Sequence, residues 1–266
     1  MRTIVIQSYR TTHIERWIQR CMQTVQEWAT NSGYEYEFID DALFEYVPRQ
    51  LRDKSSTSLL PLTDIARLGV LQERLASAYD RAIWLDADVV IFRPDQLRIP
   101  AKSGASLCHE IWSYTDAQGQ VHHRRGINNA AMVFDRGHPL LGFLHHAALE
   151  LYGHLEPTQI RTTTLGTDFL TKLGRLYPMR LLTEVACLSP LLVHALSANQ
   201  QPELLQEHAK RFGHPFHAAN LCRSKLKPAA LSDASRQTSL DADKLYDVVE
   251  MLIATEGETL CPTHRQ

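Results

Sequence analysis

Arg81-Ala82-Ile83-Trp84-Leu85-Asp86-Ala87-Asp88 is the segment from which the fold can be predicted. Its apolar run leads into two aspartates, and a second apolar run, Val89-Val90-Ile91-Phe92, follows at once. A short apolar run of this kind is typical of a buried central strand. Because ligands in open α/β sheets bind beyond the carboxyl ends of the strands, the sequence predicts a ligand site at Asp86 and Asp88.

The residues before this segment predict a β-α-β unit. Residues 3–6 are a β-branched run that predicts a first strand, and residues 34–39 predict a second. Thr12 and Glu15 have the spacing of a capping box, so a helix is expected to begin there, and Gly33 is a natural end for it. The helix is supported by apolar residues at spacings of three and four, namely Ile14, Trp17, Cys21, Val25 and Trp28.

The rest of the chain continues the alternation of helices and strands. A second helix is expected to start near Thr63, and the polar stretch from Thr115 to Arg125 predicts a loop. The other predicted elements are strands at residues 105–109 and 129–134 and helices at 139–152, 167–175 and 241–254. These patterns predict one large α/β domain or two closely fused subdomains.

Composition restricts the class of protein. The chain has 266 residues, of which 44% are hydrophobic and 22% charged, so it can bury a sizeable core. A formal net charge of −2 without a Lys/Arg run gives no sign of a nucleic-acid partner. The five cysteines are scattered and lack C-x-x-C spacing, which fits a reducing compartment. With neither a signal peptide nor a membrane-spanning stretch in the sequence, we expect a cytoplasmic protein.

Asp86 and Asp88 are the first candidates for chemistry. Two carboxylates so close together form a hard-oxygen site suited to Mn²⁺ or Mg²⁺, and such an ion can also bind a diphosphate leaving group. The simpler alternative is that both residues only end a strand. The same letters recur at Asp241-Ala242-Asp243, where they open a predicted helix and are better interpreted as an N-cap.

The segments Asp64-Ile65-Ala66-Arg67-Leu68 and Tyr79 to Pro94 resemble the DXD glycosyltransferases of the glycogenin and lipopolysaccharide galactosyltransferase type, and the related capsular and mannosyltransferase types. The resemblance implies a GT-A (Rossmann-like) fold with a mixed central sheet flanked by helices, in a single domain over residues 1–266. Residues 1–95 would bind the nucleotide sugar and residues 96–266 the acceptor.

The resemblance also assigns roles to the residues that match these motifs. Asp64 and Arg67 would help to hold the nucleotide sugar, and Asp86 and Asp88 would bind Mn²⁺ (or Mg²⁺) and the diphosphate. Such residues also have ordinary uses: Asp64 could complement a helix dipole, and Arg67 could be a surface helix residue.

Three shorter matches follow in the order expected for the family. The segment with Asn128 and Asn129 resembles the family's strand that faces the donor sugar, and the segment with Asp168 resembles its acidic segment near the reacting sugar. His214-Pro215-Phe216-His217, followed by Lys225, resembles the late histidine that completes the metal site and the basic residue that meets the phosphate. In this late motif Asn220 stands where the pattern has glycine, so His214 and His217 both stay open, with His217 preferred.

Several of these residues have other readings as well. Asn128 and Asn129 could be turn residues, and Asp168 with Thr167 could cap a helix. Gln7 and Tyr9, at the end of the first strand, are candidates for contact with the nucleotide base, although both could be ordinary loop residues.

The implied reaction is transfer of a sugar from a nucleoside-diphosphate sugar, UDP-linked rather than GDP-linked, to a hydroxyl of a glycan, lipid or small-molecule acceptor. The resemblance implies retention of configuration; if the enzyme inverts, Asp168 or Glu110 is the expected base. The rival functions are a haloacid-dehalogenase-like phosphatase that uses Asp86-Ala87-Asp88, a nucleotidyltransferase, and a non-catalytic nucleotide-sugar-binding module. The first strand lacks the Gly-rich phosphate loop that a nucleotidyltransferase needs.

Overall fold

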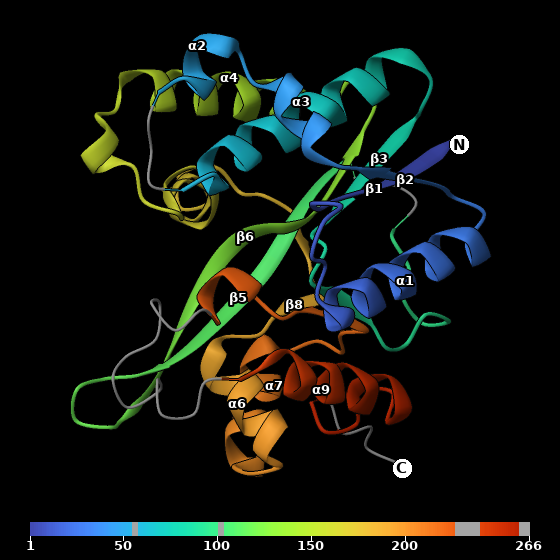
Figure 1. Cartoon of the computed structure of the whole chain (residues 1–266), viewed down its shortest axis with the longest axis vertical. Coiled ribbons are helices and arrows are strands. Elements are labelled where there is room, and N and C mark those ends of the chain that lie inside the picture. The colour runs from blue at the N-terminus through green and yellow to red at the C-terminus, as the bar shows by residue number, and fades with distance from the viewer. Residues whose placement is uncertain (55–57, 101–103, 227–239, 261–266) are drawn as a thin grey trace.

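A six-stranded mixed sheet forms the centre of the molecule. The computed structural model describes residues 1–54, 58–100, 104–226 and 240–260. The strand order is β2-β1-β3-β6-β5-β7, and the long strands β5 and β6 cross the view of Figure 1 diagonally. The strands are β1 (Thr3–Ser8), β2 (Glu35–Ile39), β3 (Arg81–Leu85), β5 (Ala105–Thr115), β6 (Val121–Asp135) and β7 (Leu181–Leu182).

Helices cover both faces of this sheet. The strands β1, β2 and β3 are parallel and are joined by α1 (Arg16–Asn31) and by the segment that contains α3 (Leu60–Ser77), whereas β6 runs antiparallel to β3. In Figure 1, α3 and α4 (Pro139–His154) lie on one side of the sheet and α1 on the other. This is the α/β sheet flanked by helices that the sequence predicts.

Strand β3 is buried on both faces, as its apolar run predicts. Ala82 and Trp84 join the core beneath α3 and α4, and Ile83 and Leu85 join the core beneath α1. This alternation is the two-residue period of a strand. The first residue, Arg81, is 1% exposed and forms an ion pair with Asp135 of the neighbouring strand.

A smaller sheet lies beside the larger one. It consists of β4 (Val89–Ile91), β8 (Val185–Cys187) and β9 (Ala218–Asn220), in the order β4-β9-β8. Its core is shared with α1, α6 (Pro190–Ala198), α7 (Pro202–Phe212) and α9 (Ala242–Ala254). The chain leaves β3 of the large sheet, turns through Asp86, Ala87 and Asp88, and enters β4 of the small sheet. The two aspartates therefore lie at the junction of the two sheets.

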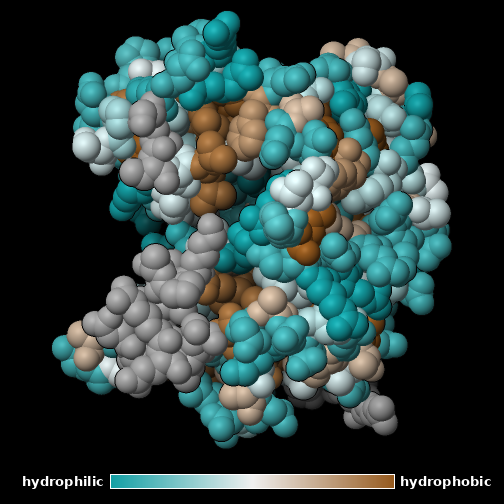
Figure 2. Space-filling view, viewed as in Figure 1, coloured by the Kyte–Doolittle hydropathy of each residue, from teal (hydrophilic) through white to brown (hydrophobic). Residues whose placement is uncertain are grey.

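Short helical segments complete the described chain. They are η1 (Asp41–Tyr46), α2 (Arg49–Arg52), η2 (Pro157–Gln159), η3 (Thr164–Asp168), α5 (Phe169–Leu173) and η4 (Arg223–Lys225). None of the described helices is long and apolar enough to cross a lipid bilayer. On the face drawn in Figure 2, hydrophilic residues predominate and hydrophobic residues are exposed in smaller patches.

The predicted helix starts need correction. Helix α1 begins at Arg16, not at Thr12, and Glu15 precedes it in extended conformation without capping it through its side chain. The Glu15 carboxylate instead accepts hydrogen bonds from Tyr9 Oη (2.8 Å) and from the guanidinium of Arg223. The capping-box prediction fails because tertiary partners take the carboxylate. Helix α3 begins at Leu60, a turn before the predicted Thr63.

The predicted loop from Thr115 to Arg125 is wrong as well. Strands β5 and β6 continue through it as a hairpin that pairs up to Thr115 and Val121. The turn is closed by Asp116 Oδ1, which accepts hydrogen bonds from the backbone N–H groups of Gln118 (3.0 Å) and Gln120 (2.8 Å). Residues near the end of the hairpin are largely exposed, so they lack the apolar alternation by which a half-buried strand is recognised.

Four cysteines lie in the described part of the chain, and all four are buried free thiols: Cys21, Cys108, Cys187 and Cys222. The Sγ atoms of Cys108 and Cys187 lie 3.6 Å apart. This separation is well beyond the length of a disulfide bond. Cys261 lies outside the described residues.

Candidate active site

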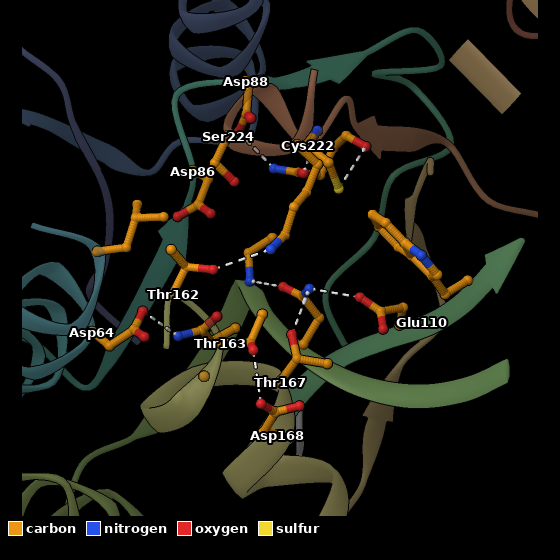
Figure 3. A pocket seen from close by; sticks show the side chains of 18 of the residues that line it. Asp64, Asp86, Asp88, Glu110, Thr162, Thr163, Thr167, Asp168, Cys222 and Ser224 are labelled. Atoms are coloured by element: carbon orange, nitrogen blue, oxygen red, sulfur yellow. Dashed lines mark hydrogen bonds between the residues drawn. The ribbon is translucent and has the colours of Figure 1, made fainter. Parts of the chain in front are cut away.

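A polar cavity of about 390 Å³ opens where the two sheets meet. Figure 3 shows Asp86 and Asp88 in its upper part, Asp168 below and Glu110 to the right. Residues from α3, the β3–β4 turn, the β5–β6 hairpin and the segment before η3 line it, together with residues around η4. Of the residues predicted for the site, it brings together Asp64, Arg67, Asp86, Asp88, Asn128, Asn129, Asp168 and Lys225.

Asp86 is held on the side of the large sheet. Its Oδ1 accepts a hydrogen bond from Trp84 Nε1 (2.7 Å) and forms an ion pair with Arg67 Nη1 (3.0 Å). The side-chain amide of Gln7 donates to the backbone carbonyl of Asp86 (3.0 Å). Burial raises the pKa of Asp86 above its ordinary value, while the charge of Arg67 opposes the rise. Gln7 therefore supports the turn from behind rather than lining the cavity.

Asp88 is held on the side of the small sheet. Its Oδ1 accepts a hydrogen bond from Asn220 Nδ2 (2.6 Å), and its Oδ2 accepts one from the backbone N–H of Arg223 (2.7 Å). Burial, and then the neighbouring carboxylate of Asp86, raise the pKa of Asp88 to about 6. A cation bound beside Asp88 would offset both the burial of this carboxylate and the nearby charge of Asp86.

Asp64, Arg67 and Asn129 form a buried network beside Asp86. Asp64 Oδ1 accepts a hydrogen bond from Asn129 Nδ2 (2.8 Å) and lies 3.5 Å from Arg67 Nη2. Arg67 Nη1 also donates to the backbone carbonyl of Asn129 (2.8 Å). Burial raises the pKa of Asp64 to about 6, against the opposing charge of Arg67. A Cβ on Gly166 would lie 3.0 Å from Asn129 Oδ1, so the glycine leaves space for this network.

A β-bulge explains why two consecutive asparagines line the same cavity. Strand β5 pairs Leu107 with Met132 but pairs the next residue, Cys108, with Asn128, so β6 carries extra residues at this point. In a regular strand neighbouring side chains point to opposite faces, and a bulge breaks this alternation. Asn128 Nδ2 donates to Glu110 Oε2 (2.8 Å) and to Thr167 Oγ1 (3.1 Å), which ties the hairpin to η3.

Asp168 and Lys225 lie at the lower and outer parts of the cavity. Asp168 Oδ2 accepts hydrogen bonds from Arg161 Nη2 (2.9 Å) and Thr163 Oγ1 (2.7 Å). Its side chain makes no capping hydrogen bond to α5, so the alternative of a helix cap is not supported. Lys225 Nζ donates to Thr162 Oγ1 (3.1 Å), which places its charge at the rim.

The structure does not bring His217 to the cavity. His217 lies three residues before Asn220, and its backbone carbonyl accepts hydrogen bonds from the N–H groups of Phe92 and Arg93 at the far end of β4. Three residues of strand correspond to about 10 Å, so a side chain there is remote from Asp88. The described residues hold no group of three or more His, Cys, Asp and Glu side chains that could bind a metal ion. His214 does not line the cavity either.

Tyr9 also lies outside the cavity, next to the segment that holds Asp88. Its hydroxyl donates to Glu15 Oε2 (2.8 Å), and the guanidinium of Arg223 lies 5.6 Å from its ring centroid. Because the backbone N–H of Arg223 binds Asp88, Tyr9 and Glu15 help to fix the position of that loop.

Sequence reasoning missed several cavity residues: Trp112, Arg124, Arg161, Thr162, Thr163 and Asn220. Trp112 and Arg124 pair across the hairpin that the sequence predicts as a loop. Asn220 could be found only from the pairing of Val89 with Asn220, which depends on residues distant in sequence.

No protein-family model and no curated protein sequence matches the chain. Among solved structures, the chain is similar to a glycosyltransferase involved in the glycosylation of the major capsid of PBCV-1, with a TM-score of 0.50, 12% identity, and coverage of 94% of this chain and 100% of that one. It is also similar to mouse xyloside xylosyltransferase 1 in its apo form, with a TM-score of 0.40 and 11% identity. This match covers 84% of the present chain and 98% of the mouse chain.

At such low identity the likeness concerns the fold alone, and of these two structures the first, with the higher TM-score, is the one that supports a conclusion. Together with the mixed central sheet and its flanking helices, it confirms the predicted fold class: the chain has a GT-A type α/β fold.

Proposed function

We propose that the chain is a metal-dependent glycosyltransferase that moves a sugar from a nucleoside-diphosphate sugar, UDP-linked rather than GDP-linked, to an acceptor hydroxyl. One observation carries the proposal: Asp86 and Asp88 meet at the edge of a polar cavity at the end of a buried strand. Ligands of α/β folds bind at that edge. The UDP preference rests on the sequence resemblance, and the acceptor is a glycan, a lipid or a small molecule.

The donor atoms around Asp86 and Asp88 fit Mn²⁺ or Mg²⁺. Both ions prefer oxygen ligands, and burial raises the pKa of both aspartates, with the charge of Asp86 adding to the rise at Asp88, so a bound cation would favour their charged forms. Asp86 makes its contacts with Trp84 and Arg67 through Oδ1, which leaves Oδ2 for an ion. Such an ion would offset the charge that develops on the leaving diphosphate. His217 is not part of this proposal because it does not line the cavity.

The remaining cavity residues have roles that follow from their positions. Arg67 and Lys225 add positive charge on two sides of the cavity, which favours a diphosphate leaving group. Asn129 and Asp168 are held by Asp64 and Arg161 and would orient the donor sugar. A phosphatase that used Asp86 as its nucleophile fits less well, because the ion pair with Arg67 lowers the reactivity of that carboxylate.

Calorimetric titration with UDP and GDP, each with and without Mn²⁺, tests the proposal. We expect metal-dependent binding of UDP that is lost in Asp88→Asn and on chelation of the metal. Asp243→Asn is the matched control, because it makes the same change in the same tripeptide at an exposed helix start. If neither nucleotide binds under any metal condition, the proposal fails.

A further inference from the structure

One face of the β5–β6 hairpin forms a wall of the cavity. Trp112 lies directly opposite Arg124 in the register of the two strands, and both side chains line the cavity. Residues two apart on a strand share a face, so Trp112 follows Glu110 on this wall, about 7 Å further along β5. The opposite face of the hairpin packs against the core shared with α6 and α7, where Ile111 is 1% exposed. A ligand of the hairpin would therefore bind on its cavity face.

The cavity face of the hairpin extends away from the two aspartates. The backbone N–H of Asp86 donates to the carbonyl of Ala130 at the end of β3 (2.8 Å). Arg124 precedes Ala130 by six residues of β6, a separation of up to about 20 Å in an extended strand. In Figure 1 this end of the hairpin extends beyond the other strands of the sheet. Arg124 is therefore placed for a group that lies further out than a diphosphate bound at Asp86 and Asp88.

Arg124 also differs from the other cations of the cavity in its contacts. Two of those cations form ion pairs with aspartates and one donates to a threonine hydroxyl; they are Arg67, Arg161 and Lys225 respectively. Within the part of the chain that the structure describes, the Arg124 guanidinium forms neither an ion pair nor a hydrogen bond. Its charge is thus available to an anion that enters the cavity.

Glu110, the carboxylate next to Trp112 on this face, is directed elsewhere. Its Oε2 accepts a hydrogen bond from Asn128 Nδ2 (2.8 Å). Its Oε1 is buried without a hydrogen-bond partner and lies against Gly126, where a Cβ would come within 2.8 Å. Burial raises the pKa of Glu110, and the hydrogen bond from Asn128 and then the charge of Arg124 oppose the rise. Arg124 acts on Glu110 only at a distance, so its five N–H donors remain for a ligand.

Trp112 supplies an apolar surface beside this guanidinium. Its indole is partly buried, because it packs against the core that contains Val185 and Cys222, and it also lines the cavity. A side chain held in this way loses little conformational freedom when a ligand binds. The face of an aromatic ring carries partial negative charge, so the electropositive C–H groups of a sugar ring pack well on it. An indole next to an unpaired guanidinium fits a sugar that carries a negative charge.

We propose that Trp112 and Arg124 form an acceptor subsite for an anionic saccharide, an inference that rests on the proposed function and names its acceptor class. The acceptor ring packs on the indole of Trp112. Its carboxylate or phosphate group binds the guanidinium of Arg124 through charged hydrogen bonds. The acceptor hydroxyl then lies on the side of Glu110, toward the donor sugar. The subsite holds the acceptor and takes no part in breaking or forming bonds, so it is compatible with retention of configuration.

Matched sets of acceptors test the requirement for charge. The protein is incubated with Mn²⁺, a panel of UDP-hexoses, and methyl glucosides, galactosides and mannosides, each as the neutral glycoside, the uronide and the 6-phosphate. We expect kcat/KM for the better anionic member of a set to exceed that of the neutral member by about 10–100-fold. The preferred anion distinguishes a carboxylate from a phosphate ligand. A neutral member that is used as well as its anionic counterparts would overturn the proposal.

Three substitutions assign the preference to the two residues. Arg124→Gln should raise KM for the anionic acceptor and bring the ratio of anionic to neutral kcat/KM to within about twofold. Arg125→Gln is the matched control and should keep the ratio, because the next residue of the strand points to the opposite face and does not line the cavity. Trp112→Ala should raise KM about tenfold for neutral and anionic acceptors alike, and Trp112→Phe should restore most of the loss. A charge preference that survives in Arg124→Gln, or is lost equally in Arg125→Gln, would refute the assignment.

Titration with UDP separates failure of this inference from failure of the proposed function. Each variant should bind UDP in the presence of Mn²⁺ with a dissociation constant within about twofold of that of the wild type, which also shows that it is folded. If the wild type binds UDP but transfers sugar to none of these saccharides, the acceptor class is wrong and the donor site stands. If it binds no UDP, the proposed function itself fails.

Discussion

The chain contains the same acidic tripeptide twice, in two unlike places. Asp86-Ala87-Asp88 joins the two sheets, and Asp88 is bound by Asn220 and by the backbone of Arg223. Asp241-Ala242-Asp243 opens α9 at the surface, where Asp241 caps the helix by accepting a hydrogen bond from the N–H of Lys244 (2.8 Å). The N-cap prediction for Asp241 is confirmed. The same three letters therefore lie at a buried junction of two sheets in one place and at an exposed helix start in the other, so the letters alone do not determine their surroundings.

The largest contrast is expected when the last aspartate of each tripeptide is neutralised. Asp88→Asn should reduce transfer by at least about 10²–10³-fold, because the ion that stabilises the leaving diphosphate would lose a ligand. Asp243→Asn should leave the rate unchanged, since this side chain is exposed at the helix start. Steady-state rates of sugar transfer measure both. Equal rates in the two variants would remove the distinction between the tripeptides.

A second contrast is expected between Asn220, which donates a hydrogen bond to Asp88, and His217, which lies outside the cavity. Asn220→Ala removes the amide that donates to Asp88 Oδ1, and we expect a 10–100-fold loss of Mn²⁺-dependent UDP affinity, the size typical of residues that orient metal ligands. Calorimetry at several Mn²⁺ concentrations would measure it. His217→Ala is the matched control and should change this affinity little, because His217 lies outside the cavity. The reverse result would restore His217 as a metal ligand.

The buried Asp64 and the exposed Asp243 should also differ in how the free energy of unfolding depends on pH. The pKa of Asp64 in the folded protein, about 6, lies above the ordinary value of about 3.9, so ionisation of Asp64 lowers the free energy of unfolding as pH rises from about 4 to 6. Asp64→Asn should therefore gain stability relative to wild type across this window, by on the order of 2 kcal/mol above pH 6.

Urea unfolding of apo protein at pH 4, 5, 6 and 7.5 would measure this gain. The exposed Asp243→Asn should show no such trend with pH. A difference between Asp64→Asn and wild type that stays constant with pH would contradict the burial of a charged Asp64.

The smallest effect is expected at the second tripeptide. Asp241→Ala removes the N-cap of α9 and should lower the free energy of unfolding by about 1 kcal/mol. UDP affinity should stay the same, because α9 contributes no residue to the cavity. Thermal unfolding together with calorimetry would check both. A loss of UDP affinity would show that α9 is coupled to the donor site.

The part of the fold that follows local patterns could be predicted from the sequence. The strands before and at Arg81–Leu85 and the helix that ends just before Gly33 follow from apolar periodicity and from a glycine with positive φ. The aspartates of the cavity could be named because they directly follow such a strand. Their neighbours Asp64, Arg67, Asn128, Asn129 and Lys225 could be named from the family resemblance, and all line the same cavity.

The rest of the site depends on pairing between distant segments. Asn220 rather than His217 lies at Asp88 because β9 pairs with β4 in one register, and a shift of register would bring different residues of β9 to the cavity. The outer part of the β5–β6 hairpin could not be recognised from the sequence, because backbone pairing forms it and its residues show no apolar alternation. Glu110 gains its surroundings from that same hairpin, so its lack of a second partner is visible only in the structure.

The bulge in β6 also determines where the chain can change in length. The pairing passes from Leu107–Met132 directly to Cys108–Asn128, so a deletion in this part of β6 would change the register that brings both asparagines to the cavity. Insertions at the turn from Asp116 to Gln120 would alter neither asparagine, because the turn lies at the other end of the hairpin. Variation in length among related chains should therefore be absent at the bulge and frequent at the turn, which makes the hairpin tip the natural place for grafted sequences.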